Sequence, residues 1–129
     1  MTERTPVQQL ADFAVACRDE PLPANVREDV VGRILDVLGN CVAGYAESRG
    51  QDTEPDRAVL RVVAGMGGTP LASVVGSDVK IPSANAALMN GSLAHALDFD
   101  DTHLPSVLHP SASVVPAALA VAEEVGATG

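Results

Sequence analysis

The sequence predicts a mainly α-helical fold, a helical bundle that carries one small β-hairpin near residues 72–81. Apolar residues recur at three- and four-residue spacing over several long segments, which is the pattern of amphipathic helices. Hydrophobic residues make up 47% of the 129 residues and charged residues 19%, as in a globular chain. Aromatic residues are nearly absent, so Ala, Val and Leu must build the core. The length suits one domain, which we expect to cover residues 1–129.

The first helix is expected over residues 6–18. Thr5 offers a capping hydroxyl, and Pro6 is favoured at the first helical position because its missing N–H has no partner there. Apolar residues then follow at helical spacing, and Pro21 and Pro23 end the helix.

A longer helix is expected over residues 24–47, where a continuous apolar stripe faces a charged side. Three glycines lie inside this segment, and each weakens a helix by about 1 kcal/mol relative to Ala. We interpret them as points of close contact between helices: Gly32, Gly39 and Gly44.

A loop over residues 47–54 leads into a shorter helix that begins at Thr53-Glu54-Pro55 and ends at the glycines after Ala64. Two β-branched runs then flank Gly76-Ser77-Asp78, a cluster of turn-forming residues. This pattern predicts a hairpin with strands near 72–75 and 79–81.

Two further helices are expected in the last third of the chain, over residues 84–98 and from Ser111 to Gly126. We expect the Ser83 side chain to cap the first of them. Pro116 lies inside the second, so that it either marks the true first turn or kinks the helix.

The two cysteines, Cys17 and Cys41, have no metal-ligand spacing, and we interpret both as buried thiols in a reducing compartment. No apolar run reaches membrane-spanning length, and the N-terminal residues do not resemble a signal peptide. The sequence therefore predicts a cytoplasmic protein with no membrane partner.

Charge is distributed unevenly along the chain. The net charge of −9 disfavours nucleic acid as a partner, because phosphate recognition needs a basic face. After Lys80 there is no Lys or Arg, although five acidic residues follow.

The most informative segment is HALDFDDTHLPSVLHP, residues 95–110, which places three aspartates and three histidines between two apolar helices. Negative charge at a helix C-terminus is unfavourable, because that end already carries partial negative charge. Asp98 follows His95 by three residues, so these two side chains can touch on a helix. Carboxylates, a hydroxyl and imidazoles gathered at two helix ends suit general acid–base catalysis.

Two other interpretations of this segment stay open. The aspartates can belong to a solvated loop in which Asp101 or Thr102 caps a helix, with His103 and His109 in structural roles. Alternatively, an Asp-rich helix end can bind Mg²⁺, or His and Asp together can bind zinc or iron. Pro105 argues against the magnesium arrangement, since such sites repeat acidic residues one helical turn apart.

Residues 82–124, together with ASVVGSDVKIP before them, resemble the signature region of the MmgE/PrpD family, which includes 2-methylcitrate dehydratase and cis-aconitate decarboxylase. The strings that carry the resemblance are NG, HALDFDDT and HPS, in that order. It implies a helical N-terminal domain, here incomplete, that later sequence completes and joins to a smaller α/β lid domain. It also implies a lyase that acts on a small polycarboxylate without metal or cofactor.

The resemblance also implies site residues. The family's active-site aspartate falls on Asp98, its threonine on Thr102, and its histidine on His109, with His103 as the alternative. We therefore expect Asp98 and His109 to transfer protons, Thr102 to bind a substrate carboxylate, and His103 or Asp101 to orient its neighbours. Asp101 and His95 are further candidates to bind substrate.

A polycarboxylate substrate needs Lys or Arg to bind it, and residues 81–129 contain none. We therefore expect those cations to come from sequence beyond Gly129 or from a partner chain, and the same cations to make the acidic cluster tolerable. The resemblance also suggests a homodimer.

The sequence therefore predicts the N-terminal part of an MmgE/PrpD-type lyase, similar to 2-methylcitrate dehydratase and inactive alone. Two alternatives stay open: a non-catalytic helical remnant that acts as an interaction module, and one subunit of a split decarboxylase or isomerase.

Overall fold

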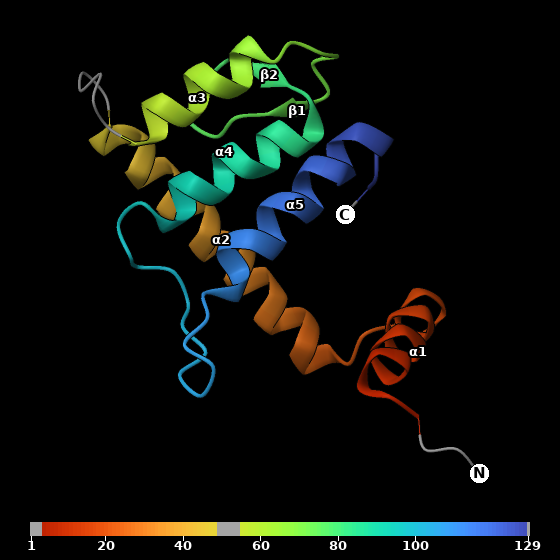
Figure 1. Ribbon diagram of the computed structural model, residues 1–129. Coiled ribbons are helices and arrows are strands. Elements are labelled where there is room, and N and C mark those ends of the chain that lie inside the picture. The colour runs from red at the N-terminus through yellow and green to blue at the C-terminus, as the bar shows by residue number, and fades with distance from the viewer. Residues whose placement is uncertain (1–3, 49–54, 129) are drawn as a thin grey trace. The chain divides into compact units, whose positions relative to one another are not determined.

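The computed structural model describes residues 4–48 and 55–128, and the chain divides into two compact units, Met1–Val31 and Gly32–Gly129 (Figure 1). Over the described residues there are five helices and one two-stranded antiparallel sheet. The predicted mainly helical class with one small hairpin is confirmed. That residues 1–129 form one domain stays a prediction.

Helix α1, Pro6–Asp19, begins where the sequence predicts. The Thr5 side chain accepts a hydrogen bond from the backbone N–H of Gln8, and the Gln8 side chain accepts one from the backbone N–H of Thr5. This capping box satisfies two backbone donors that a helix start leaves without partners. The prediction that Cys17 is buried is wrong, because its side chain is exposed on this helix.

Helix α2, Ala24–Glu47, has the predicted bounds, and its second half packs against helix α4, Ser83–His95. A Cβ added at Gly44 would lie 2.5 Å from the carbonyl oxygen of Leu93, so the two backbones touch directly. Gly44 thus makes the close helix contact predicted for it. Gly32 and Gly39 face open space, so the same interpretation is wrong for them.

The predicted loop over 47–54 falls mostly on residues 49–54, which lie outside the described residues, as do Thr53 and Glu54 of the predicted helix start. Helix α3, Pro55–Gly65, follows. The hairpin pairs β1, Ala72–Ser73, with β2, Lys80–Ile81, in the register Ala72↔Ile81 and Ser73↔Lys80. The strands are shorter than predicted, although the N–H of Val74 still bonds the carbonyl of Val79 at 3.0 Å.

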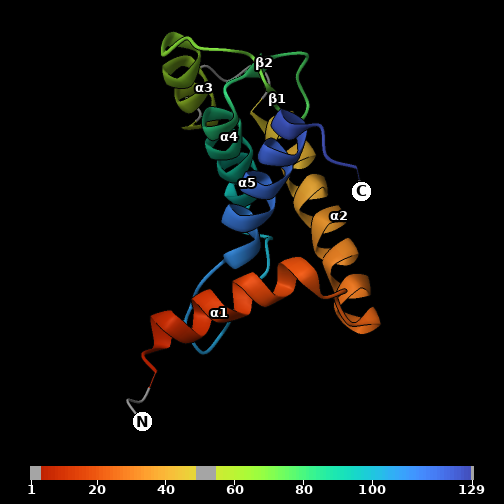
Figure 2. The ribbon, with the colours of Figure 1, turned by 90° about the vertical axis from the view of Figure 1, so that its right-hand side faces the viewer.

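Helices α4 and α5, Pro110–Val125, lie side by side (Figures 1 and 2). Pro116 lies in the interior of α5 rather than in its first turn. A proline cannot donate to the carbonyl four residues earlier, which here belongs to Ala112. A Cβ at Gly91 of α4 would lie 2.9 Å from that carbonyl oxygen, so the proline and the glycine act at the same point of helix contact.

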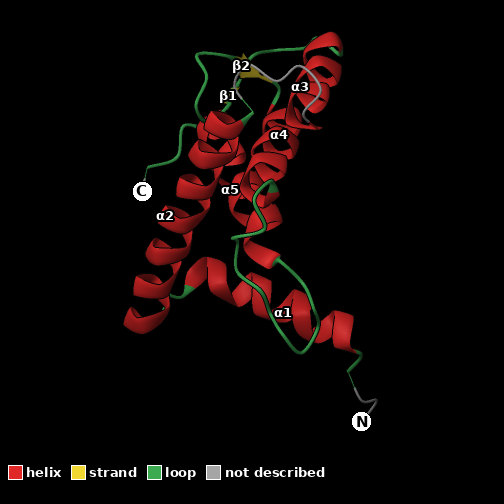
Figure 3. Ribbon diagram, turned by 90° about the vertical axis from the view of Figure 1, so that its left-hand side faces the viewer, coloured by secondary structure: helices red, strands yellow, loops and turns green. Residues whose placement is uncertain are grey.

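The ends of these two helices differ from the predictions. Helix α4 begins at Ser83, but no side chain caps it, and the buried Ser83 hydroxyl has no hydrogen-bond partner among the described residues. It ends at His95, three residues before the predicted end, so the acidic segment lies in a loop, drawn in green in Figure 3. Helix α5 begins one residue early, and Gly126 closes it in the left-handed conformation typical of helix C-termini.

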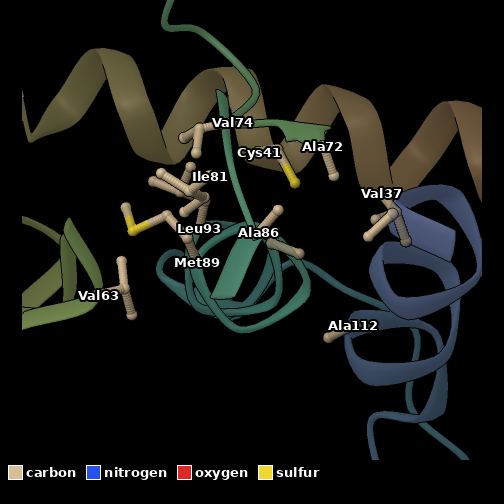
Figure 4. Close-up of a cluster of buried hydrophobic side chains, with 12 residues drawn as sticks. Val37, Cys41, Val63, Ala72, Val74, Ile81, Ala86, Met89, Leu93 and Ala112 are labelled. Atoms are coloured by element: carbon tan, nitrogen blue, oxygen red, sulfur yellow. The ribbon is translucent and has the colours of Figure 1, made fainter. Parts of the chain in front are cut away.

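The core of the larger unit is built from small and medium aliphatic side chains (Figure 4), as the scarcity of aromatics predicts. Helix α4 lies at its centre and contributes residues to it along its whole length. The largest fully buried side chains are Met89, Leu93, Val37, Val63, Val74, Pro116 and Cys41. Among the helices of the described residues, none is both long and apolar enough to cross a membrane.

Candidate active site

The site forms where α4 ends. The backbone N–H of Asp98 bonds the carbonyl of His95 at 3.1 Å, which closes the last turn. Asp98 then adopts a φ of 56°, a left-handed conformation that is uncommon for residues other than glycine but tolerated by aspartate. The chain therefore turns sharply, and the next residues fold back against the helix end.

Asp100 is the centre of the cluster. Its side chain is fully buried, and its two carboxylate oxygens lie 3.0 and 3.2 Å from Nδ1 of His95. Nδ1 of His109 lies 3.4 Å from Oδ2 of the same carboxylate. The two imidazoles also meet edge to face, with ring centroids 4.8 Å apart. One buried carboxylate thus holds two histidines from the facing ends of α4 and α5.

Asp98 lies on the exposed side of this cluster. Its carboxylate is 3.8 Å from Nε2 of His109, and its side chain is 79% exposed. The three-residue spacing suggested a contact between His95 and Asp98. In the structure His95 is hydrogen-bonded to Asp100 instead. Asp98 and His109, the two residues expected to transfer protons, are therefore neighbours.

Asp101 makes its hydrogen bond and its ion pair outside this cluster. Its Oδ1 accepts a hydrogen bond from the backbone N–H of Ser111 at 3.0 Å, and its Oδ2 pairs with Arg33 of α2. This carboxylate caps the start of α5, as the structural alternative proposed. The positive charge beside it comes from Arg33, so the expectation that only sequence outside this chain supplies such charge is wrong for Asp101.

His103 and Thr102 lie outside the cluster. His103 forms an isolated bridge with Leu108, and its Nδ1 is 2.6 Å from the Ser106 hydroxyl in an exposed turn. Thr102 is also exposed. The sequence left open whether His109 or His103 transfers a proton. The geometry favours His109, because His109 lies in the cluster and His103 does not.

Apart from Ser83, the serine and asparagine side chains of α4 are hydrogen-bonded, as a polar seam on a buried helix requires. The Asn85 amide donates to the carbonyl of Val63, and the Ser92 hydroxyl donates to that of Leu88. Asn90 joins α4 to the hairpin through the backbone of residues 73 and 75. These three side chains are engaged in hydrogen bonds within the fold, and His95 is the titratable residue of α4 at the site.

Four side chains offer ligand atoms that all lie within 4.8 Å of one another: His95, Asp98, Asp100 and His109. Two imidazoles and two carboxylates suit zinc. At zinc–ligand bond lengths of about 2 Å, however, tetrahedral ligand atoms lie only about 3.3 Å apart, so these atoms would have to move inward. The arrangement as it stands is a cluster of acids and bases in which His95 is hydrogen-bonded to Asp100.

A groove of about 630 Å³ opens beside the cluster, between α4, α5 and the loop that joins them. His95 and His109 lie in its wall, and most of the other lining residues are apolar, among them Leu88, Leu108 and Ala112. A small molecule in this groove would contact both imidazoles.

Sequence reasoning missed Asp100 and Arg33. In the sequence Asp100 is one of three acids, and helical spacing cannot place a residue beyond a helix end. Arg33 lies 68 residues before its partner, and no local pattern links them. The single signal available was that His95 and Asp100 flank the point where the helical pattern stops.

Comparison with known proteins adds the family. Residues 8–129 match the family described as the MmgE/PrpD N-terminal domain. Human cis-aconitate decarboxylase is 46% identical over 46 residues, and the mouse protein of the same name is 44% identical over 46 residues. Each match covers 36% of this chain and 9% of the relative. Since the family match spans nearly the whole chain, this chain belongs to the MmgE/PrpD family and forms its N-terminal domain.

Proposed function

We propose that this chain is the N-terminal part of a lyase that removes water or carbon dioxide from a small polycarboxylate by metal-independent acid–base catalysis. The observation that carries the proposal is the proximity of Asp98 to His109, 3.8 Å apart, with His109 in the wall of the groove. Family membership supports the reaction class.

In a dehydration, a base removes the proton next to a carboxylate, and an acid protonates the leaving hydroxyl group. Asp98 and His109 are the two groups that we assign to these transfers. A substrate atom placed beside this pair, rather than between its members, can lie within hydrogen-bond reach of both, and hydrogen bonds at such sites tighten when substrate binds. Thr102 in the adjoining loop would hydrogen-bond a substrate carboxylate.

The substrate's own negative charge must be balanced. Residues 81–129 contain no Lys or Arg, and Arg33 is already paired with Asp101. We therefore propose that cations from the remainder of the full-length protein, or from a second copy in a homodimer, bind the substrate carboxylates. The isolated chain is then expected to be inactive. A cytoplasmic location is part of the same proposal.

Decarboxylation is the second candidate reaction. It is favoured by the similarity to the human and mouse proteins, both of which are cis-aconitate decarboxylases. Dehydration and decarboxylation both require a proton to move at a carbon next to a carboxylate, so the same pair of side chains serves either reaction.

The test is an assay of the full reading frame that contains these residues, supplied separately with 2-methylcitrate and cis-aconitate. We expect turnover of one of them, and a loss of about 10²-fold or more in kcat for Asp98→Asn and for His109→Gln. Asp78→Asn, which changes an exposed hairpin residue, is the matched control.

Undiminished turnover in the Asp98→Asn variant would remove that residue from the mechanism. No turnover of either substrate by the full reading frame would instead favour the interaction module. Turnover that appears only after a second polypeptide is added would identify a subunit of a split enzyme.

A further inference from the structure

We infer that Asp100 is a positioning residue that keeps the proton of neutral His109 on Nδ1, so that Nε2 is the atom that exchanges a proton with the substrate. The tautomer itself follows from the geometry of the cluster. Its catalytic meaning rests on the proposed function.

Asp100 is buried between two imidazoles. Its side chain has no exposed surface, and among the described residues Nδ1 of His95 and Nδ1 of His109 lie within 3.5 Å of its carboxylate. A buried carboxylate needs donors, because removing it from water without them costs several kcal/mol. An N–H group on Nδ1 of either imidazole would supply such a donor.

The surroundings of His109 distinguish its two neutral tautomers. Its Nδ1 is buried and makes no hydrogen bond with the described residues, and the nearest acceptor is Oδ2 of Asp100 at 3.4 Å. In the Nε2–H tautomer, the lone pair of Nδ1 would face a negatively charged oxygen at that distance. In the Nδ1–H tautomer, a donor faces an acceptor, and a small rotation of the ring completes the bond. The second arrangement is the stable one.

The other ring nitrogen of His109, Nε2, lies next to Asp98. With the proton on Nδ1, Nε2 of His109 carries a lone pair and lies 3.8 Å from the exposed Asp98 carboxylate. The His109 side chain itself forms part of the groove wall. Nε2 can then accept a proton from a substrate and return it. Buried acids that orient a catalytic imidazole act in this way in other enzymes, and changing such an acid to its amide leaves the imidazole in the wrong tautomer.

Both histidines can use the carboxylate together. A carboxylate has about four lone-pair sites, and the edge-to-face packing of the two rings, with centroids 4.8 Å apart, brings both Nδ1 atoms to it. His95 thus helps to hold Asp100, and through it His109.

The test is nitrogen-15 NMR of the histidine side chains, which distinguishes the two tautomers by chemical shift. The chain contains only three histidines, so substituting each one assigns every signal. We expect neutral His109 to be mainly the Nδ1–H tautomer in the wild-type chain. Asp100→Asn should shift it toward Nε2–H, because an amide can offer its N–H to an unprotonated Nδ1.

Asp101→Asn is the matched control for the spectrum, since it removes a neighbouring carboxylate that makes its hydrogen bond and its ion pair outside the cluster. Its spectrum should keep the wild-type tautomer of His109. Finding the Nε2–H tautomer in the wild-type chain would overturn the inference, and this result does not depend on whether the Asp100 variant folds. An unchanged tautomer in a folded Asp100→Asn variant would overturn it as well.

A kinetic measurement on the full reading frame separates this inference from the proposed function. Asp100→Asn should lower kcat about 10²-fold or more with little change in KM, since the residue does not contact substrate. If Asp98→Asn abolishes turnover but Asp100→Asn does not, the positioning role fails and the proposed function stands. If the tautomer is as expected but neither variant loses activity, the proposed function fails.

Discussion

Asp101 reaches from the loop after α4 to the first turn of α5, where its Oδ1 accepts a hydrogen bond from the backbone N–H of Ser111 at 3.0 Å. The acidic segment that appears unfavourable at the end of one helix thus lies at the beginning of the next. Negative charge there is stabilising, because a helix N-terminus carries partial positive charge and unpaired N–H groups.

Replacing Asp101 by Ala should therefore lower the free energy of unfolding by about 1 kcal/mol, the usual value of a helix cap. The Arg33 partner is partly exposed, so its ion pair adds less. Urea denaturation followed by circular dichroism measures the loss, with Asp78→Ala as a control at an exposed turn. Equal midpoints for the two variants would mean that Asp101 does not stabilise α5.

Alanine substitutions at two glycines of α2, Gly39 and Gly44, should change stability in opposite directions. Gly44→Ala places a Cβ against the carbonyl oxygen of Leu93 and should destabilise the chain by about 1–3 kcal/mol. Gly39→Ala meets nothing within 4 Å and should stabilise it by up to about 1 kcal/mol through helix propensity. Thermal and urea denaturation of both variants measure the difference. The same sign of change in both variants would contradict the contact between α2 and α4.

The two cysteines should differ in reactivity. Burial raises the pKa of the Cys41 thiol to about 11, whereas Cys17 is exposed. At pH 8 we expect a thiol reagent such as 5,5′-dithiobis(2-nitrobenzoate) to modify Cys17 rapidly and Cys41 only after unfolding, because the thiolate is the reactive form. Cys17→Ser isolates the slow thiol. Rapid modification of Cys41 in that folded variant would be the contrary result.

The same thiol predicts a loss of stability at high pH. The folded-state pKa of Cys41 lies above the unfolded value, so its contribution is fully present below about pH 9 and is lost as pH rises toward 11. Cys41→Ala should remove this part of the pH dependence while lowering stability at pH 7. The urea midpoint measured between pH 7 and pH 11 tests both statements.

Glu123 should make stability depend on pH at the acidic end. Partial burial raises its pKa, but hydrogen bonds from Lys80 and Ser73 outweigh that effect and hold the pKa below its usual range. Its contribution is therefore present above the unfolded pKa, near 4.5, and is lost as pH falls through the lower folded value. Glu123→Gln should flatten the change in urea midpoint between pH 6 and pH 3. An unaltered slope would show that the contact between α5 and the hairpin carries no charge-dependent energy.

The sequence by itself determined the features whose causes are local. Thr5 and Pro6 specify the start of α1, Gly126 specifies the end of α5, and the turn residues after Val75 specify the hairpin. Each of these depends on hydrogen bonds and backbone angles within a few residues, so a pattern in the sequence predicts them. The presence of an acid–base cluster between two apolar helices was predictable for the same reason.

Which side chains of the acid–base cluster contact one another depends on the tertiary structure. Asp100 and Asp101 are neighbours of the same type, yet one is buried between two imidazoles and the other caps a helix beside Arg33. Cys17 and Cys41 likewise occupy similar apolar stripes, but only one is buried. These outcomes depend on where α4 stops and on how closely Gly44 and Gly91 let the helices approach, and such long-range packing leaves no periodic signal in the sequence.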